Sequence, residues 1–425
     1  MKQLLLLYLL ATSMLGYGQS YTSYFTGDTA NASSSPQAGI CLMGGATEHD
    51  SAMVWFLNRA DGGDILVIRA SGSDGYNDYL YSDLGVTVNS VETIVFNSAA
   101  AANDAYVIEQ VANAEAIWIA GGDQWNYVSY WRNSPIDSAI NAGLNNRNLV
   151  IGGTSAGMAV LGGVQFTAEN GTVTSSEALN DPYRNDVTLS QDDFFDLPIL
   201  DDVITDTHYD DPDRRGRHMV FMARMLVNWG IQSRGIACDE YTAVCIDTDG
   251  KAYVYGEAPA ENDYAYFLQV RCETPIGPET ITQSTPLTWD RGNEAVYAYR
   301  INGNNAGDRW FDLSDWETGD GGEWFHWWAD NGTFNQGPGA APDCSGVGIA
   351  ASSQASGFEL WPNPASEQLQ LTGLKEPARL LDVMGRTLFQ LPANTMQLDV
   401  SELNPGLYFV VSASGQRQQL VIAGR

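Results

Sequence analysis

Short apolar runs recur along the first 150 residues, and the segments between them show helical spacing of apolar residues. Continuous apolar runs of this length are typical of strands that are buried on both faces. Strands that alternate with helices form βα units, so the pattern predicts an α/β fold, a mostly parallel sheet with helices on both faces. The predicted strands are residues 38–43, 64–69, 91–96, 115–120 and 149–151, and the predicted helices are 50–58 and 103–112.

The last of these strands leads into Gly153-Thr-Ser155-Ala-Gly157, and a helix is predicted to begin at Ala156. Gly-x-Ser-x-Gly between a strand and a helix is typical of a nucleophile elbow, a strained turn that lifts the serine hydroxyl above the sheet edge. The start of the helix would point free N–H groups at an oxyanion. Ser155 is the candidate nucleophile, and the motif alone leaves open a glycine-rich junction with an incidental serine.

A second glycine-bearing turn, Gly121-Gly122-Asp123-Gln124, follows the predicted strand 115–120. Ligands of open parallel sheets bind beyond the carboxyl ends of the strands. This turn and Ser155 are therefore expected to border one site.

Beyond residue 203 the chain continues with elements assigned to the same region. A strand-like run ends at His208, a helix is predicted over 219–226, and a strand is predicted over 235–245. The tryptophan- and glycine-rich segment 287–334 is assigned to the catalytic region as trailing strands and loops.

Composition shifts at Asn335, after which Gly, Pro, Ala and Ser dominate and predict a flexible linker. The short strands beyond it predict a small β-sandwich. Those strands are 367–371, 379–383, 387–391, 397–400, 407–411 and 418–422. The expected organisation is a signal peptide (1–18), a catalytic domain (19–335), a linker (336–357) and a sandwich (358–425).

Residues 1–18 have the layout of a secretory signal, with Lys2, an apolar run over 4–11 and small residues before Gln19. The apolar run is too short to span a membrane. No later stretch reaches the ~18 uninterrupted apolar residues of a transmembrane helix, so we expect an exported protein without a membrane span.

The formal net charge is −31, from 52 acidic and 21 basic residues. This balance argues against nucleic acid or anionic membranes as partners, and an acidic surface also keeps an exported enzyme soluble. The five cysteines show no Cys-x-x-Cys spacing, so neither a zinc site nor a thioredoxin-like motif is expected, and no metal or cofactor is assigned to the chain. Export permits disulfides, but the odd count leaves at least one cysteine outside intramolecular bridges.

A serine nucleophile needs a base, and the chain has four histidines. His208 ends a strand-like run and is the best candidate, with Glu240 near the end of the next strand as the group that would orient it. His49 is assigned to a polar turn, His218 to helix packing and His326 to an aromatic-rich strand.

Four motifs in this order carry a family resemblance: the turn 121–124, the elbow 153–157, Asp206-Thr-His208-Tyr209 with its following arginines, and Asp239-Glu240-x-Thr-Ala. Together, over residues 38–300, they resemble the family of cyanophycinase and the aspartyl dipeptidases. The resemblance implies a flavodoxin-like sheet similar to that of class I glutamine amidotransferases. It also implies residue roles: Ser155 as nucleophile, His208 as base, Glu240 as orienting acid, the N–H groups of Gly122 and Ala156 as oxyanion hole, and Gln124 and Asp206 at the substrate.

In cyanophycinase three spaced arginines follow the histidine and define the pocket for a poly-aspartate backbone that bears arginine on β-linked amides. A gapless alignment retains Arg214 and Arg217 and puts Pro212 where the first arginine would stand. Guanidinium groups match carboxylates, so both arginines are expected to bind a substrate carboxylate, the alternative being surface charge at a helix start. Proline offers no donor, so weak hydrolysis of cyanophycin is expected beside activity on shorter aspartyl peptides.

The last seventy residues resemble a different family. Trp361-Pro-Asn-Pro364, Asp382-Val-Met-Gly-Arg386 and Leu403-Asn-Pro-Gly-Leu-Tyr408 are similar to the type A sorting domain of type IX secretion. This resemblance implies the secretion machinery as a partner and a secreted or cell-surface location.

The expected function is a secreted serine exopeptidase-like hydrolase that cleaves aspartyl peptide bonds, β-aspartyl or cyanophycin-type bonds among them, through an acyl-enzyme. One alternative is an esterase of the α/β-hydrolase type, in which the order serine, acid, histidine would make His326 the base. The other is a binding protein that keeps the scaffold without the activity.

Overall fold

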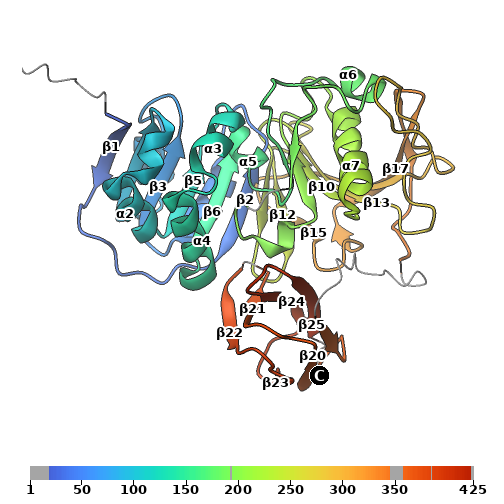
Figure 1. Cartoon of the computed structure of the whole chain (residues 1–425). Helices are drawn as coiled ribbons and strands as arrows, with labels where there is room; N and C mark the ends of the chain where they lie inside the picture. The colour runs from blue at the N-terminus through green and yellow to red at the C-terminus, as the bar shows by residue number, and fades with distance from the viewer. Residues whose placement is uncertain (1–18, 192–193, 345–357, 384, 423–425) are drawn as a thin grey trace, which may run out of the picture.

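The computed structural model describes residues 19–191, 194–344, 358–383 and 385–422. The predicted signal peptide and most of the predicted linker lie outside these residues. Two sheets stand side by side in the catalytic region, and the C-terminal region packs below them (Figure 1).

The first sheet has ten strands and is parallel only in its centre, where the predicted βα units lie. In spatial order the strands are β1 (Tyr21–Gly27), β4 (Ser90–Phe96), β3 (Asp64–Arg69), β5 (Ala116–Ile119), β6 (Val150–Thr154), β2 (Gly39–Met43), β11 (Ala243–Ile246), β12 (Lys251–Tyr255), β15 (Arg309–Asp312) and β16 (Gly319–Asp320).

The expectation of a mostly parallel sheet is corrected at both sides of that centre. Strands β11, β12, β15 and β16 continue the sheet in antiparallel pairings. Short connections join β11 to β12 and β15 to β16, and a parallel pair would need a long crossover. The residues before the first predicted strand form β1, which pairs antiparallel with β4. Numbered along the chain, the parallel strands have the order 3-2-4-5-1 and differ from the flavodoxin order 2-1-3-4-5 in the place of β2.

Helices cover both faces of the parallel centre, as expected. Helix α1 (Asp50–Arg59) packs on one face against Met43 and Trp118, while α2 (Ala105–Asn113) and α4 (Pro135–Arg147) pack on the other against Ile117. The remaining helices are α3 (Gln124–Trp131), α5 (Ala156–Ala159), α6 (Ser175–Asn180) and α7 (Arg215–Trp229), with short irregular turns at Tyr79–Asp83 (η1), Ala99–Asn103 (η2) and Pro198–Leu200 (η3).

The second sheet has six strands and packs one face on the first sheet and the other on α7. Its order is β18 (Thr333–Pro338), β17 (Gly322–Asp330), β14 (Val296–Asn302), β13 (Tyr264–Val270), β10 (Arg234–Cys238) and β9 (Val203–Asp206), and a hairpin of β7 (Gln165–Phe166) and β8 (Leu189–Ser190) lies apart. The segment 287–334 supplies its outer strands and β15–β16 of the first sheet. Strand β9 lies beside α5, and β10 pairs with β9 in parallel. Residues that follow these two strands can therefore reach the end of β6.

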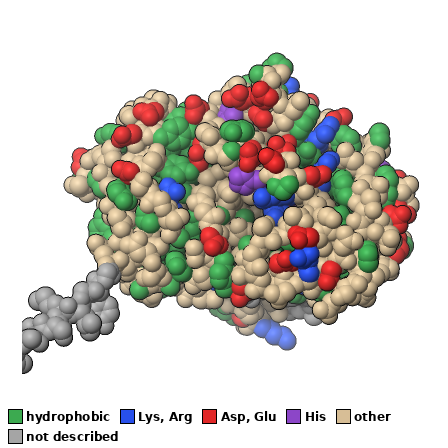
Figure 2. Space-filling view, turned by 90° about the horizontal axis from the view of Figure 1, so that it is seen from above, with side chains coloured by type: hydrophobic (Ala, Val, Ile, Leu, Met, Phe, Trp, Pro, Cys, Tyr) green, Lys and Arg blue, Asp and Glu red, His purple; other side chains and the backbone are tan. Residues whose placement is uncertain are grey.

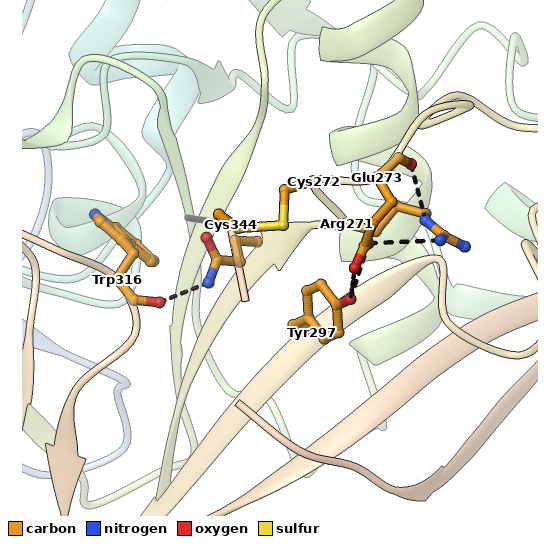
Figure 3. Close-up of a disulfide and its surroundings, with 7 residues drawn as sticks. Arg271, Cys272, Glu273, Tyr297, Trp316 and Cys344 are labelled. Atoms are coloured by element: carbon orange, nitrogen blue, oxygen red, sulfur yellow. Dashed lines mark hydrogen bonds and ion pairs between the residues drawn. A yellow bond between two sulfur atoms is a disulfide. The ribbon is translucent and has the colours of Figure 1, made fainter. Parts of the chain in front are cut away.

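A disulfide joins Cys272, just after β13, to Cys344, near the end of the catalytic region (Figure 3). Beside it the Glu273 carboxylate pairs with Arg271 at 3.4 Å and accepts a hydrogen bond from Tyr297. The other three cysteines, Cys41, Cys238 and Cys245, are buried as free thiols.

The C-terminal region consists of two facing sheets around a common apolar core. Their strands are β19 (Glu359–Trp361), β20 (Gln368–Thr372) and β23 (Gln397–Asp399) in one, and β22 (Thr387–Leu391), β21 (Ala378–Asp382), β24 (Gly406–Ser412) and β25 (Arg417–Ile422) in the other. Among the helices of the described residues, we find none that is long and apolar enough to cross a membrane.

Candidate active site

Ser155 occupies the turn between β6 and α5 with a φ of +53°, a conformation that non-glycine residues rarely adopt. A Cβ on Gly153 would lie 2.6 Å from the carbonyl carbon of Gly157, and one on Gly157 would lie 2.0 Å from the Ile119 oxygen. The two glycines let the turn close against β5. The serine is held at the carboxyl edge of the sheet, as the elbow motif predicts.

The two other expected members of the site reach Ser155 from the second sheet. The Ser155 hydroxyl lies 2.8 Å from Nε2 of His208, and Nδ1 of His208 lies 2.5 Å from Oε1 of Glu240. The tautomer with its proton on Nδ1 satisfies both contacts: the serine donates to Nε2, and Nδ1 donates to the carboxylate. About a quarter of the His208 and Glu240 side chains is exposed, so a substrate can reach them.

Gly44 and Gly45, directly after β2, form the wall behind the imidazole, and none of the sequence motifs indicates a role for them. The Gly44 carbonyl accepts the N–H of His208, and a Cβ on Gly45 would lie 2.4 Å from Nε2 of the ring. The Gly45 carbonyl also accepts the N–H of Tyr241, directly after Glu240. The signal that could have found this wall is a glycine pair at the carboxyl end of a central strand.

The two amides expected to form the oxyanion hole belong to residues close to Ser155. A Cβ on Gly121 would touch the Ser155 Cβ at 3.5 Å, which sets the 121–122 turn beside the serine. The N–H groups of Gly122 and Ala156 make no hydrogen bond within the described part of the chain. A hydroxyl next to an imidazole, with free amides at hand, has the parts needed for acyl transfer.

Asp206 and Arg217, both expected to contact substrate, are bound to each other in the interior. Each is 3% exposed, and the guanidinium donates from Nε at 2.9 Å and from Nη2 at 2.5 Å to the two carboxylate oxygens. Burial favours the neutral acid, but the charge and hydrogen bonds of Arg217 outweigh it and lower the pKa of Asp206. Arg217 also donates to Thr172 and Val173, so its guanidinium is engaged inside the fold, in place of the substrate contact that the sequence predicts.

Arg214 stays at the site, just before α7. Its Nη1 donates to the Thr207 carbonyl, next to His208, at 2.9 Å, and its buried Nε has no hydrogen-bond partner within the described residues. Arg215 points elsewhere and forms a two-point ion pair with Asp213. Arg214 is therefore the arginine of this loop whose Nε donor is unused. Arg215 is paired with Asp213 and does not supply the arginine that the alignment lacks at Pro212.

Gln124 begins α3 next to the 121–122 turn, and its side-chain amide donates to the Phe166 carbonyl at 2.9 Å. This bond ties α3 to the β7–β8 hairpin. The amide oxygen of Gln124 remains as the group that could meet a substrate.

The other histidines lie apart from the serine. His218 is fully buried between Tyr209 and the Ile204 carbonyl, and burial lowers its pKa to about 4, in agreement with a packing role. His326, on β17, faces Glu294 at 3.4 Å and the N–H of Ala340. His326, the base of the esterase alternative, therefore contacts residues of the second sheet, whereas Ser155 contacts His208. His49 binds the Gly256 carbonyl.

Several carboxyl groups lie close to Glu240. Asp210 accepts the N–H of Glu240, and the neighbouring Asp239 is 97% buried, since its exposed fraction is 3%. Burial, followed by the charge of Asp210, raises the pKa of Asp239 to about 8. Acidic side chains gather beside a histidine on the face seen from above, away from the C-terminal region (Figure 2). The described residues contain no group of His, Cys, Asp and Glu suited to a metal ion.

Comparison with known families finds a match in each of the two regions of the chain. Residues 74–254 match peptidase family S51. Residues 359–423 match the secretion system C-terminal sorting domain. The S51 match covers the elbow, His208 and Glu240, and it supports a serine peptidase, while the sorting domain indicates a secreted or cell-surface protein carried by type IX secretion.

Curated relatives of the S51 region include the cyanophycinases of Synechococcus elongatus and Thermosynechococcus vestitus. Each is 25% identical over 253 residues, which cover 56% of this chain and 73% of the relative. Among solved structures, a peptidase from an acI-B1 actinobacterium aligns with a TM-score of 0.38 and 17% identity, covering 53% of this chain and 90% of that one. A putative peptidase E from Listeria monocytogenes aligns at 0.30 and 13%, covering 49% and 94%.

Proposed function

We propose that this protein is a secreted serine peptidase that hydrolyses peptide bonds next to an aspartyl residue. The observation that carries the proposal is the continuous hydrogen-bond chain from Ser155 through His208 to Glu240. The S51 match and the cyanophycinase relatives support the substrate class.

In the proposed reaction the Ser155 oxygen attacks the scissile carbonyl while its proton passes to Nε2 of His208. Glu240 stabilises the imidazolium that forms, and the amides of Gly122 and Ala156 bind the oxyanion. His208 then gives the proton to the leaving amine, and the acyl group stays on Ser155. A water molecule, deprotonated by the same histidine, releases the acid and restores the hydroxyl.

Substrate selection is assigned to Arg214. Its spare Nε donor lies beside the base, and a guanidinium can grip one carboxylate of an aspartyl substrate. Because Arg217 is committed to Asp206, one arginine does the work that three do in the cyanophycinase pocket, which favours short aspartyl peptides over the polymer.

The test is a panel of α-aspartyl dipeptides, β-aspartyl dipeptides and cyanophycin, with products read by mass spectrometry. Hydrolysis of at least one aspartyl peptide is expected, with cyanophycin cut weakly. Ser155→Ala and His208→Ala should lower kcat by about 10³-fold or more, and Glu240→Gln by less. Ser129→Ala, an exposed serine on α3, is the matched control. Unchanged turnover in Ser155→Ala would overturn the mechanism, and no hydrolysis of any panel member by the wild type would favour the binding protein.

A further inference from the structure

The C-terminal region is packed onto one segment of the catalytic region, residues 194–201, which includes η3. Helix α4 holds this segment from behind: Asn141 donates to the Phe194 carbonyl at 2.8 Å, and its amide oxygen accepts the N–H of Asp196 at 2.7 Å. Asn145, one turn further along α4, donates to the Asp196 carboxylate at 2.9 Å. The segment is thus a fixed surface, and we call residues 194–201 with Asn145 the docking face.

Two arginines of the sorting domain meet the acidic groups of the docking face. Arg379, on β21, donates to Asn145 at 2.8 Å and to Asp196 at 3.3 Å. Arg417, on β25, pairs with Asp201 and also lies 3.5 Å from Asp196. The Asp196 side chain is 15% exposed, so a charge of the catalytic region is covered and neutralised by the other region.

Apolar contacts surround these ion pairs. Val383 and Leu407 of the sorting domain are buried in the same core cluster as Phe194, Leu197 and Leu200 of the docking face. Three partly buried side chains pack against the margin of this cluster: Phe195, Phe409 and Val421. The turn after β21 also comes close, since a Cβ on Gly385 would lie 2.6 Å from the Asp196 carbonyl. Partly buried Arg–carboxylate pairs beside an apolar cluster are typical of a specific interface.

The docking face lies at the edge of the sheet opposite the candidate site. Helix α4 ends at Arg147 and β6 begins at Val150, whereas Ser155 follows the far end of β6. Five strand residues span roughly 16 Å, and Figure 1 shows the sorting domain below the sheets with α5 above. The docked domain therefore leaves the serine uncovered.

We propose that the sorting domain is a non-covalently held partner of the catalytic region, and that cutting the connection over residues 345–357 does not by itself release it. The surface that the sorting domain contributes is a face of its β-sandwich on which two arginines lie within an apolar patch. Release then requires loss of the pairs that Arg379 and Arg417 make with Asp196 and Asp201. This proposal is independent of the hydrolytic activity.

The experiment places a recognition sequence for a site-specific protease within residues 345–357 of the full chain. After complete cleavage at about 1 µM protein, gel filtration should show both fragments in one peak. Arg379→Glu with Arg417→Glu should separate them, because two attractions become repulsions next to Asp196. The exposed Lys375→Glu reverses one positive charge elsewhere on the sorting domain, serves as the control for each single reversal and should leave one peak.

Separate elution of the wild-type fragments would overturn the proposal, and so would a single peak from the double variant. Asp201→Arg added to Arg417→Glu tests the pairing directly: it should restore at least part of the single peak lost in Arg417→Glu alone. Circular dichroism of each uncut chain shows whether both regions are folded. A double variant that does not fold leaves the wild-type and charge-swap results to decide.

Discussion

The His208 imidazole fits against Gly45 because glycine has no side chain at this position. Gly45 has a φ of +123°, and its missing side chain leaves the space that the imidazole fills. His208 donates to Glu240 from Nδ1, so the imidazole is held between the Gly45 wall and this carboxylate.

Gly45→Ala should therefore lower kcat by about 10²-fold, with a smaller effect on folding, because a displaced base loses the serine proton. The strained φ adds about 1–3 kcal/mol of destabilisation. The measurements are steady-state kinetics on the best panel peptide and thermal unfolding. Gly75→Ala, at a position with open space around it, is the control. Activity close to wild type in Gly45→Ala would mean that the ring can move without loss.

Asp239, the residue before Glu240, is expected to make the stability of the fold depend on pH. Burial and the charge of Asp210 raise its pKa to about 8, above the value of about 3.9 for an unfolded aspartate. Between these values the folded state holds the extra proton, so this group makes the unfolding free energy fall as pH rises, by at most ~1.4 kcal/mol per pH unit.

Asp239→Asn should remove that dependence and flatten the curve of urea midpoint against pH between about pH 5 and 8. The carbonyl of asparagine can still accept the Tyr264 N–H, which the Asp239 carboxylate accepts in the wild type. Asp74→Asn, on an exposed loop, should follow the wild-type curve. Equal slopes in Asp239→Asn and the wild type would contradict the raised pKa.

At the level of secondary structure, the ion pair of Asp206 and Arg217 joins the end of β9 to α7. His208 follows β9 by two residues, so this pair helps to fix the strand end from which the base projects. Arg214, on the same loop, makes one hydrogen bond to the backbone.

Arg217→Met should destabilise the fold by about 3–5 kcal/mol, because it leaves a buried carboxylate without its partner. Arg214→Met should cost about 1 kcal/mol, yet lower kcat/KM for aspartyl peptides by about 10-fold to 100-fold. Urea unfolding and kinetics on acidic and neutral peptides separate the two effects. The reverse pattern, with Arg217→Met stable but inactive, would return Arg217 to the substrate site.

The elements that the sequence predicts best are those whose pattern is local. The strand 64–69 and the strand 387–391 are found with the same bounds, because continuous or alternating apolar residues end at polar turns. The interval 235–245 is two strands separated by a turn that carries Glu240, a break that its apolar residues do not reveal. The sequence also indicated Ser155, His208 and Glu240, whereas the commitment of Arg217 to Asp206 depends on packing between β9 and α7, which no motif encodes.

For the molecule as a whole, the contact between its two regions changes what truncation is expected to do. A chain that ends after Cys344 should keep its turnover on the panel peptides, because the docking face and Ser155 lie at opposite edges. It should lose stability, because Phe194, Leu197 and Leu200 lose their cover, at about 1.5–3 kcal/mol for a large side chain that becomes fully exposed.

The loss should appear as a melting temperature several degrees lower, at roughly 2–4 °C for each kcal/mol. Scanning calorimetry of the full and truncated chains gives the difference, and kinetics at 25 °C gives the turnover. Identical melting curves would mean that the docking face contributes no stability.

In a chain that ends after Cys344, the disulfide to Cys272 would fix the new C-terminus to the fold. Strand β18 lies at the margin of its sheet and pairs with β17 alone, so an unattached end beyond it could peel away. The cross-link anchors that end to the loop after β13. A carboxypeptidase degrading the shortened chain from its new terminus would meet the cross-linked Cys344 before it reached β18, so the shortened chain should resist trimming into that strand.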